Sequence, residues 1–229
     1  MCIRDRDMLE AASRASTCGN MQLYSLIVTQ SRELREALAP CHFNQPMVTQ
    51  APCVITVCAD VHRFSMWCEQ RDAEPCYDNF AWFLNGVTDA LLAAQNLCVE
   101  AEAHGLGICY LGTTIYTAEE IARILDLPKG VIPVTTIVVG HPDESPELTD
   151  RLPLDAVVHC EKYHHYTSSE IDELWAEKET SEETRRLLEE NGLPNLAQIF
   201  TRNRYRAEDN LAISRNYFAL LKKQGFFNN

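Results

Sequence analysis

The feature that most constrains the fold of this chain is a long apolar pattern that begins near Asp78. Its apolar residues recur at three- and four-residue steps, which is the spacing of one face of an α-helix. The residues that we expect on this buried stripe are Phe80, Phe83, Leu84, Val87, Leu91, Ala94, Cys98 and Ala101. Alanines along the segment allow another helix to approach closely, and Gly105 suits the C-terminal cap. The pattern therefore predicts a long helix that ends near Gly105.

Short apolar runs alternate with shorter helical patterns on both sides of this helix. The predicted strands are 23–28, 54–59, 108–111 and 131–139. The predicted shorter helices are 7–15, capped by Asp7; a short one capped by Ser31 and ended at Pro40; and 117–127, capped at its start. A loop that carries His42, Asn44 and Gln45 lies between them. Continuous apolar strands are typical of a sheet covered on both faces, so the class is α/β or mixed α+β.

The C-terminal part of the chain follows a different pattern. Beyond Leu154 the sequence predicts two acidic helices, a break at residues 192–194 and a terminal helix from Asn210 to Gln224. Its apolar content is thin for a separate core, so we expect residues 167–229 to be a helical extension of a core formed by residues 7–166. Residues 1–6 show no pattern that continues into the next segment, and we interpret them as a non-native leader.

Composition excludes several classes of protein. The 229 residues carry a net charge of −13, which disfavours nonspecific binding to nucleic acid. No apolar stretch is long enough to span a bilayer and no secretory signal opens the chain, so we expect a cytoplasmic protein without a membrane partner. The ten cysteines include no CxxC pair, so zinc-ribbon and thioredoxin spacings are missing, and we expect no metal site.

A polar segment, Ser16–Gln22, separates the first predicted helix from the first strand. Its hydroxyls, amides and backbone groups suit the binding of a flat polar ligand, although such loops are more often only loops. The chain has no glycine-rich dinucleotide fingerprint, phosphate loop or GxSxG elbow. His164 and His165 lack a Cys or carboxylate partner at metal-ligand spacing, so exposed loop histidines are the favoured interpretation.

Four segments in order give the chain a specific resemblance. They are residues 16–22, 86–97, 103–112 and the run Pro-Glu-Leu-Thr-Asp-Arg-Leu-Pro at 146–153. Together they resemble FMN-dependent nitroreductases, most closely the branch of oxygen-insensitive major NADPH nitroreductases and NADPH-flavin oxidoreductases. The resemblance implies an α+β fold with a mixed, mainly antiparallel sheet flanked by helices. It also implies a homodimer with FMN at the subunit interface and a C-terminal helical excursion that wraps the partner.

The resemblance also implies the residues that hold the cofactor. The positions that match FMN contacts are Ser16, Thr17, Cys18, Asn20, Gln22, Gln45, Tyr110, Leu111, Gly112, Thr113 and, on the phosphate, Arg151. Gly19 and Asn20 would form the floor of the substrate pocket, and Arg202 matches less securely an arginine used for NADPH. Ser16 and Thr17 could instead cap or turn the chain, and Arg151 could pair with Asp150 or Asp155.

The implied reaction is a ping-pong transfer of hydride from NAD(P)H through FMN to a nitroaromatic, quinone or flavin, without a catalytic side chain.

The chain departs from the family in three places. Arg4 and Arg6 lie too near Ser16 to serve as the family's leading arginines, so we expect an N-terminal truncation. Thr149 replaces a lysine and Ile115 replaces an arginine. Two alternatives therefore stay open: a flavin or chromate reductase with little nitroreductase activity, and a flavin-poor remnant that acts as a binding module.

Overall fold

The structure is a computed structural model that describes residues 3–227, and the chain forms two compact units. The first unit contains the residues up to Asp143 and those from Ile213 onward, and the second is Glu144–Ala212. The domain division expected from the sequence, after residue 166, stays a prediction. Each unit is described below by itself.

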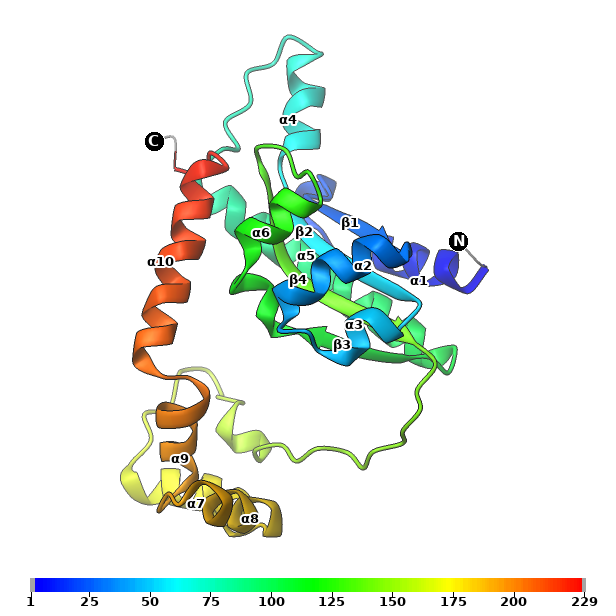
Figure 1. Ribbon diagram of the computed structural model, residues 1–229. Coiled ribbons are helices and arrows are strands. Elements are labelled where there is room, and N and C mark those ends of the chain that lie inside the picture. The colour runs from blue at the N-terminus through cyan, green and yellow to red at the C-terminus, as the bar shows by residue number, and fades with distance from the viewer. Residues whose placement is uncertain (1–2, 228–229) are drawn as a thin grey trace. The chain divides into compact units, whose positions relative to one another are not determined.

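The first unit is built on a four-stranded sheet in which every neighbouring pair is antiparallel (Figure 1). Its strands are β1 (Tyr24–Thr29), β2 (Cys53–Asp60), β3 (Gly107–Leu111) and β4 (Val131–Gly140), in the spatial order β1-β2-β4-β3. All four lie where the sequence predicts strands, and the mixed α+β class is confirmed. The side chains of β2 are all buried, as expected for a central strand covered on both faces.

The two faces of the sheet pack against different helices. Ile55 and Ile137 point to the face covered by α5 (Phe80–Ala103) and α1 (Ile3–Ser13), and they share a core cluster with Ala12, Ala94 and Leu97. Their strand neighbours Val54 and Val138 point to the opposite face and pack against Val48 of α3 (Pro46–Gln50). This alternation follows the two-residue period of a strand.

The long helix α5 lies close to the sheet, as its small residues predict. A methyl group added at Gly86 would approach the Leu23 carbonyl oxygen and the Ala59 side chain to 3.1 Å, so only glycine fits there without a shift. The helix begins after Asn79, whose side chain accepts from the Trp82 N–H, rather than after Asp78. Gly105 has the left-handed φ of +71° that the expected C-terminal cap requires.

The predicted buried stripe of α5 was wrong in part, because the helix has two apolar faces. Phe83, Ala94, Cys98 and Ala101 are buried, and Val87 is partly buried. Phe80, Leu84 and Leu91 are exposed by 42%, 47% and 44%, and they share the open side with Leu92 and Val99. Three- and four-residue spacing does not distinguish a face on the sheet from a face on the surface.

Three further expectations need correction. The first helix begins at Ile3, so Asp7 lies inside it, 3.8 Å from His104 Nε2, and does not cap it. The loop with His42 and Gln45 contains a 3₁₀ turn (Ala39–His42) and then α3. Thr117 precedes α6 (Ala118–Ile124) but donates its hydroxyl to the Cys41 carbonyl at 2.8 Å, so it caps no helix amide. The expected short helix is α2 (Arg32–Leu38), and Ser31 is its confirmed cap. A further helix, α4 (His62–Glu69), was not predicted from the sequence.

The second unit contains the two predicted acidic helices. They are α7 (Ser168–Thr180), which a capping box at Thr167 and Glu170 begins, and α8 (Glu182–Asn191), which ends at Gly192 with φ +61°. A short helix, α9 (Leu196–Ile199), and a π-helical turn (Phe200–Arg204) follow. The terminal helix α10 (Ala207–Lys223) continues the chain into the first unit, where Leu220 and Leu221 join a core cluster with Phe83.

Candidate functional site

The segment Ser16–Gln22, called here the polar loop, joins α1 to β1 in a conformation with three left-handed residues. These are Gly19, Asn20 and Gln22, with φ of +55°, +56° and +54°. Left-handed backbone is common for glycine and tolerated by asparagine, but it is uncommon for glutamine. Ser16, Gly19, Asn20 and Gln22 are exposed. The loop therefore presents polar groups to the surface in a defined shape that the rest of the unit must hold.

A buried carboxylate holds the polar loop at Cys18 and at Leu23, the residue that follows it. Asp89, 1% exposed on α5, accepts the Cys18 N–H on Oδ1 at 2.8 Å and the Leu23 N–H on Oδ2 at 3.0 Å. Hydrogen bonds to a charged acceptor are stronger than those between neutral groups. An acid within an apolar helical pattern could have marked Asp89 as a buried carboxylate, but its partners in the polar loop could not be predicted from the sequence.

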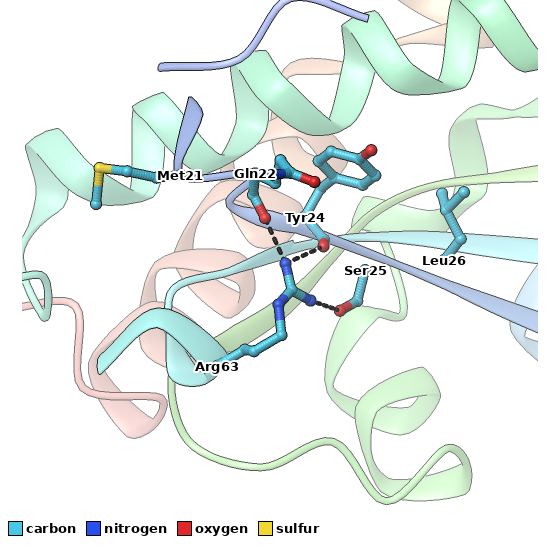
Figure 2. A pocket seen from close by; sticks show the side chains of 6 residues that line it. All are labelled: Met21, Gln22, Tyr24, Ser25, Leu26 and Arg63. Carbon is cyan, nitrogen blue, oxygen red and sulfur yellow. Dashed lines mark hydrogen bonds between the residues drawn. The ribbon is translucent and has the colours of Figure 1, made fainter. Parts of the chain in front are cut away.

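Arg63 of α4 braces the point where the polar loop enters β1. Its guanidinium donates to the carbonyl oxygens of Gln22 and Tyr24, the latter at 3.1 Å, and to Ser25 Oγ at 3.1 Å (Figure 2). It also lies 3.4 Å from the carboxylate of Asp60, which is itself largely buried. Asp60 is only three residues away, but the carbonyl partners that Arg63 braces are about 40 residues away in the chain, so no local sequence pattern reveals this role.

A pocket of about 460 Å³ opens beside this brace. Six residues line it: Met21, Gln22, Tyr24, Ser25, Leu26 and Arg63 (Figure 2). The cationic side chain in its lining, Arg63, already binds two carbonyl oxygens and the carboxylate of Asp60, which compensates its charge. The pocket therefore offers space next to Gln22 rather than an unoccupied positive charge.

The second predicted group, Tyr110–Thr113, is called here the strand-end turn because it closes β3 and opens a 3₁₀ turn (Gly112–Ile115). Leu111 is 1% exposed, whereas Tyr110 and Gly112 are exposed and Thr113 is partly exposed. Burial of part of the Tyr110 phenol and its hydrogen bond with Cys98 raise the pKa of Tyr110. Thr114 connects the turn to β4, because its hydroxyl donates to the hydroxyl of Thr136 at 3.0 Å.

Gln45 is joined to the strand-end turn through a histidine that the sequence placed only in a loop. His42 is fully buried, and its Nδ1 lies 2.8 Å from Thr113 Oγ1. The backbone N–H of Gln45 donates to the His42 carbonyl at 3.1 Å. Burial lowers the pKa of His42 to about 4, so its imidazole is neutral near pH 7. Gln45, His42 and Thr113 thus form one connected group.

The polar loop and the strand-end turn belong to opposite edges of the sheet. The loop leads into β1 and the turn ends β3, which are the two outermost strands. Register connects Leu111 through Thr136 and Thr56 to Ile27. Three steps of about 4.8 Å between strands place these edges roughly 14 Å apart. Within one chain, the two predicted groups are therefore separated by the width of the sheet.

The two predicted arginines lie in the second unit. Arg151 donates from Nη1 to Thr149 Oγ1 at 2.6 Å and to the Asp150 carbonyl at 2.8 Å, while the Asp150 carboxylate pairs with Lys178 at 2.6 Å. Arg151 is exposed and lines a pocket of about 260 Å³ that also contains Trp175. Arg202 is exposed on the π-helical turn. Their roles toward a phosphate or NADPH stay predictions.

Comparison with known proteins gives a consistent family. Residues 6–141 match the model of the Nitroreductase family. The chain is 33% identical over 159 residues to a Bacillus subtilis protein named FMN reductase (NADPH), which covers 69% of this chain and 64% of the relative. It is 35% identical over 163 residues to a Staphylococcus aureus NADPH-dependent oxidoreductase, with the same two coverages. The chain thus spans 64% of the length of these curated relatives.

Solved structures agree with the family match. A Bacteroides fragilis protein described as an oxidoreductase has 49% sequence identity and a TM-score of 0.95, with 97% of this chain and 91% of that chain covered. The NfrA1 nitroreductase from Bacillus subtilis has 26% identity and a TM-score of 0.88, with 100% and 92% covered. Among residues 3–227, no helix has the length and apolar character needed to cross a membrane.

Proposed function

Because the chain belongs to the Nitroreductase family, we propose that it is an FMN-dependent oxidoreductase that uses NAD(P)H to reduce nitroaromatics, quinones or flavins. The observation that carries the proposal is the polar loop, which Asp89 holds in an exposed conformation through Cys18 and Leu23. Its residues are those whose pattern resembles the flavin-contacting segment of the family. A relative named FMN reductase (NADPH) supports the choice of both cofactor and cosubstrate.

The residues of the first unit fit a flavin. Flat polar rings are held by backbone amides, hydroxyls and side-chain amides, and the proposed contacts are of these kinds. They would be Ser16, Thr17, Cys18, Asn20 and Gln22 from the polar loop, Gln45, and the strand-end turn Tyr110–Thr113. Arg151 would bind the phosphate, and Gly19, Asn20 and Arg202 would face the substrate or NADPH. When bound, FMN would supply the hydride-transfer chemistry, and the protein would supply orientation and hydrogen bonds.

The open apolar face of α5 supports a homodimer. Phe80, Leu84, Leu91, Leu92 and Val99 are each at least 42% exposed along one helix, and several exposed large apolar side chains on one helix favour a protein partner. A second copy of the chain would also bring its own polar loop and strand-end turn. This would allow one site to draw on both kinds of segment, although they lie on opposite edges of the sheet in each chain.

A test of the dimer uses Leu91→Asp, which places a charge on the exposed face of α5 without touching the buried one. We expect sedimentation to show a dimer for the unaltered protein and a monomer for the variant. Glu10→Lys is a charge-changing control on an exposed position of α1. A Leu91→Asp protein that sediments as the unaltered protein does would contradict the proposed interface.

The test of the activity has two stages. Purified protein is first titrated with FMN, and saturable quenching of FMN fluorescence is expected. NADPH and NADH oxidation is then measured in parallel with a nitroaromatic, a quinone, free flavin and chromate. Turnover with the nitroaromatic or the quinone supports the proposal. Protein that folds but binds no FMN favours the flavin-poor binding module, and turnover confined to flavin or chromate favours the other alternative.

A further inference from the structure

The strongest unassigned feature is the buried imidazole of His42. The residue is 0% exposed, Nδ1 lies 2.8 Å from Thr113 Oγ1, and Nε2 has no hydrogen-bond partner among residues 3–227. In folded proteins, the N–H donors of a fully buried side chain normally have a hydrogen-bond acceptor. The contact to Thr113 is therefore the interaction that decides which nitrogen carries the hydrogen.

The two possible arrangements of the hydrogen differ in what they leave unpaired. If the Thr113 hydroxyl donated to Nδ1, the neutral ring would carry its hydrogen on Nε2, a buried donor without an acceptor. If Nδ1–H donates to Thr113 Oγ1, Nε2 is left as an acceptor with an unfilled lone pair, and orphaned acceptors are tolerated better than orphaned donors. The second arrangement directs the Thr113 hydroxyl hydrogen away from His42. Thr113 is partly exposed, so this hydrogen can reach a ligand.

The backbone that follows His42 leads to Gln45, the second predicted flavin contact at this edge of the sheet. Phe43 and Asn44, between His42 and Gln45, have left-handed φ values of +55° and +54°. For phenylalanine this conformation is rare, and such backbone persists only where the surroundings impose it. The hydrogen bond from the Gln45 N–H to the His42 carbonyl closes this segment at 3.1 Å. His42 thus fixes Gln45 through its backbone and Thr113 through its ring.

We propose that His42 is a positioning residue that holds the Thr113 hydroxyl as a hydrogen-bond donor toward an acceptor atom of the bound flavin ring. The inference depends on the proposed function for the identity of the ligand. It adds a residue outside the set expected to touch the cofactor. Its effect on the flavin is exerted through Thr113, so loss of either side chain should produce the same change.

A neighbouring hydrogen bond supplies the matched control. The Thr117 hydroxyl donates to the Cys41 carbonyl at 2.8 Å, so it joins the same two segments one residue away from His42. Thr117→Val removes this link, together with a longer contact of the Thr117 hydroxyl to the Thr113 carbonyl at 3.5 Å, but leaves the His42 Nδ1–Thr113 Oγ1 pair in place. If His42 served only to join the two segments, Thr117→Val should weaken FMN binding as much as His42→Leu does.

The experiment measures FMN dissociation constants and the visible spectrum of bound FMN, with melting temperatures of the FMN-free proteins recorded alongside. We expect His42→Leu and Thr113→Val each to weaken FMN binding by about three- to tenfold, as for loss of one hydrogen bond. The double variant should bind no more weakly than the weaker single variant. His42→Asn, whose amide can replace Nδ1–H, and Thr113→Ser should restore binding, and Thr117→Val should leave it unchanged.

Several results would overturn the inference. Unchanged FMN binding in Thr113→Val, additive losses in the double variant, or an equal loss in Thr117→Val would each show that His42 does not act through the hydroxyl. If His42→Leu does not fold, Thr113→Val still decides the question. Thr113 is only partly buried, so we expect this variant to fold. Unaltered protein that binds no FMN would instead refute the proposed function, and this inference with it.

Discussion

The two edges of the sheet hold their exposed polar segments by different physical means. At the β1 edge the polar loop is held by charges: the buried Asp89 carboxylate accepts two backbone N–H groups, and Arg63 binds two carbonyl oxygens. At the β3 edge the strand-end turn is held by neutral groups, through His42–Thr113 and Thr117–Cys41. Charged clamps are stronger but costly to leave half-paired, whereas a neutral imidazole is sensitive to protonation.

The edges also differ in how they accommodate left-handed backbone. The polar loop places glycine at its first such position, Gly19. The β3 edge places Phe43 and Asn44 there, and Phe43 is 62% exposed. Gln22 has a left-handed φ as well, so both edges hold strained backbone. The contrast lies between Gly19, where glycine avoids the strain, and Phe43, where it is stored beside Gln45.

The largest expected effect comes from breaking the charged clamp. Asp89→Ala leaves the Cys18 and Leu23 N–H groups without their acceptor, and both bonds are made to a buried carboxylate. We expect the free energy of unfolding to fall by about 3–6 kcal/mol, from two charge-assisted hydrogen bonds at about 1.5–3 kcal/mol each. Urea denaturation measures this change.

The isosteric variant Asp89→Asn separates charge from shape. It retains one side-chain acceptor, so its loss should be smaller than that of Asp89→Ala, and hydrogen exchange should be faster at only one end of the polar loop. Equal stability of Asp89→Ala and the unaltered protein would mean that the carboxylate does not hold the loop.

The second effect is a pH dependence that comes from the His42 imidazole at the β3 edge. The pKa of His42 is lowered to about 4 in the folded state and is about 6.5 in the unfolded chain. Between these values only the unfolded chain takes up the proton, so stability is lost as pH falls through 6.5. We expect His42 to lower the free energy of unfolding by about 2 kcal/mol at pH 5 relative to pH 7.5.

The control for this prediction is the same pair of measurements on His42→Leu, in which other titrating groups contribute equally. The difference in stability between pH 7.5 and pH 5 should shrink by about 2 kcal/mol in the variant. Parallel pH curves for the two proteins would show that the imidazole is not buried and neutral.

Much of the fold could be predicted from the sequence because its signals are local. Three- and four-residue steps located α5, apolar runs located all four strands, and Ser31 capped α2 as expected. One failure has a clear cause, which is competition from a distant partner. Thr117 bonds to Cys41, 76 residues away, instead of capping α6, and no spacing rule reveals such a partner.

The candidate site was predictable only as a set of segments. The polar loop and the strand-end turn were identified through family resemblance, which carries no information on what holds them in place. Asp89 and Arg63 are 71 and 41 residues from partners in the loop, so only the folded structure shows their roles. The open side of α5 escaped prediction because an exposed apolar face and a core face share one apolar pattern.

The smallest effects should come from exchanging the left-handed residues of the two edges. Gly19→Ala meets no atom closer than 3.8 Å, so its cost is backbone strain alone, about 1 kcal/mol. Phe43→Gly should have the opposite sign, because glycine relieves the same strain at Phe43. Its gain should stay below about 1 kcal/mol, since the Phe43 ring contact with Tyr116, at 6.1 Å between centroids, is lost. Melting temperatures that rise for Phe43→Gly and fall for Gly19→Ala would establish that strain is stored at the β3 edge; a fall in both would place the value of Phe43 in its ring contact instead.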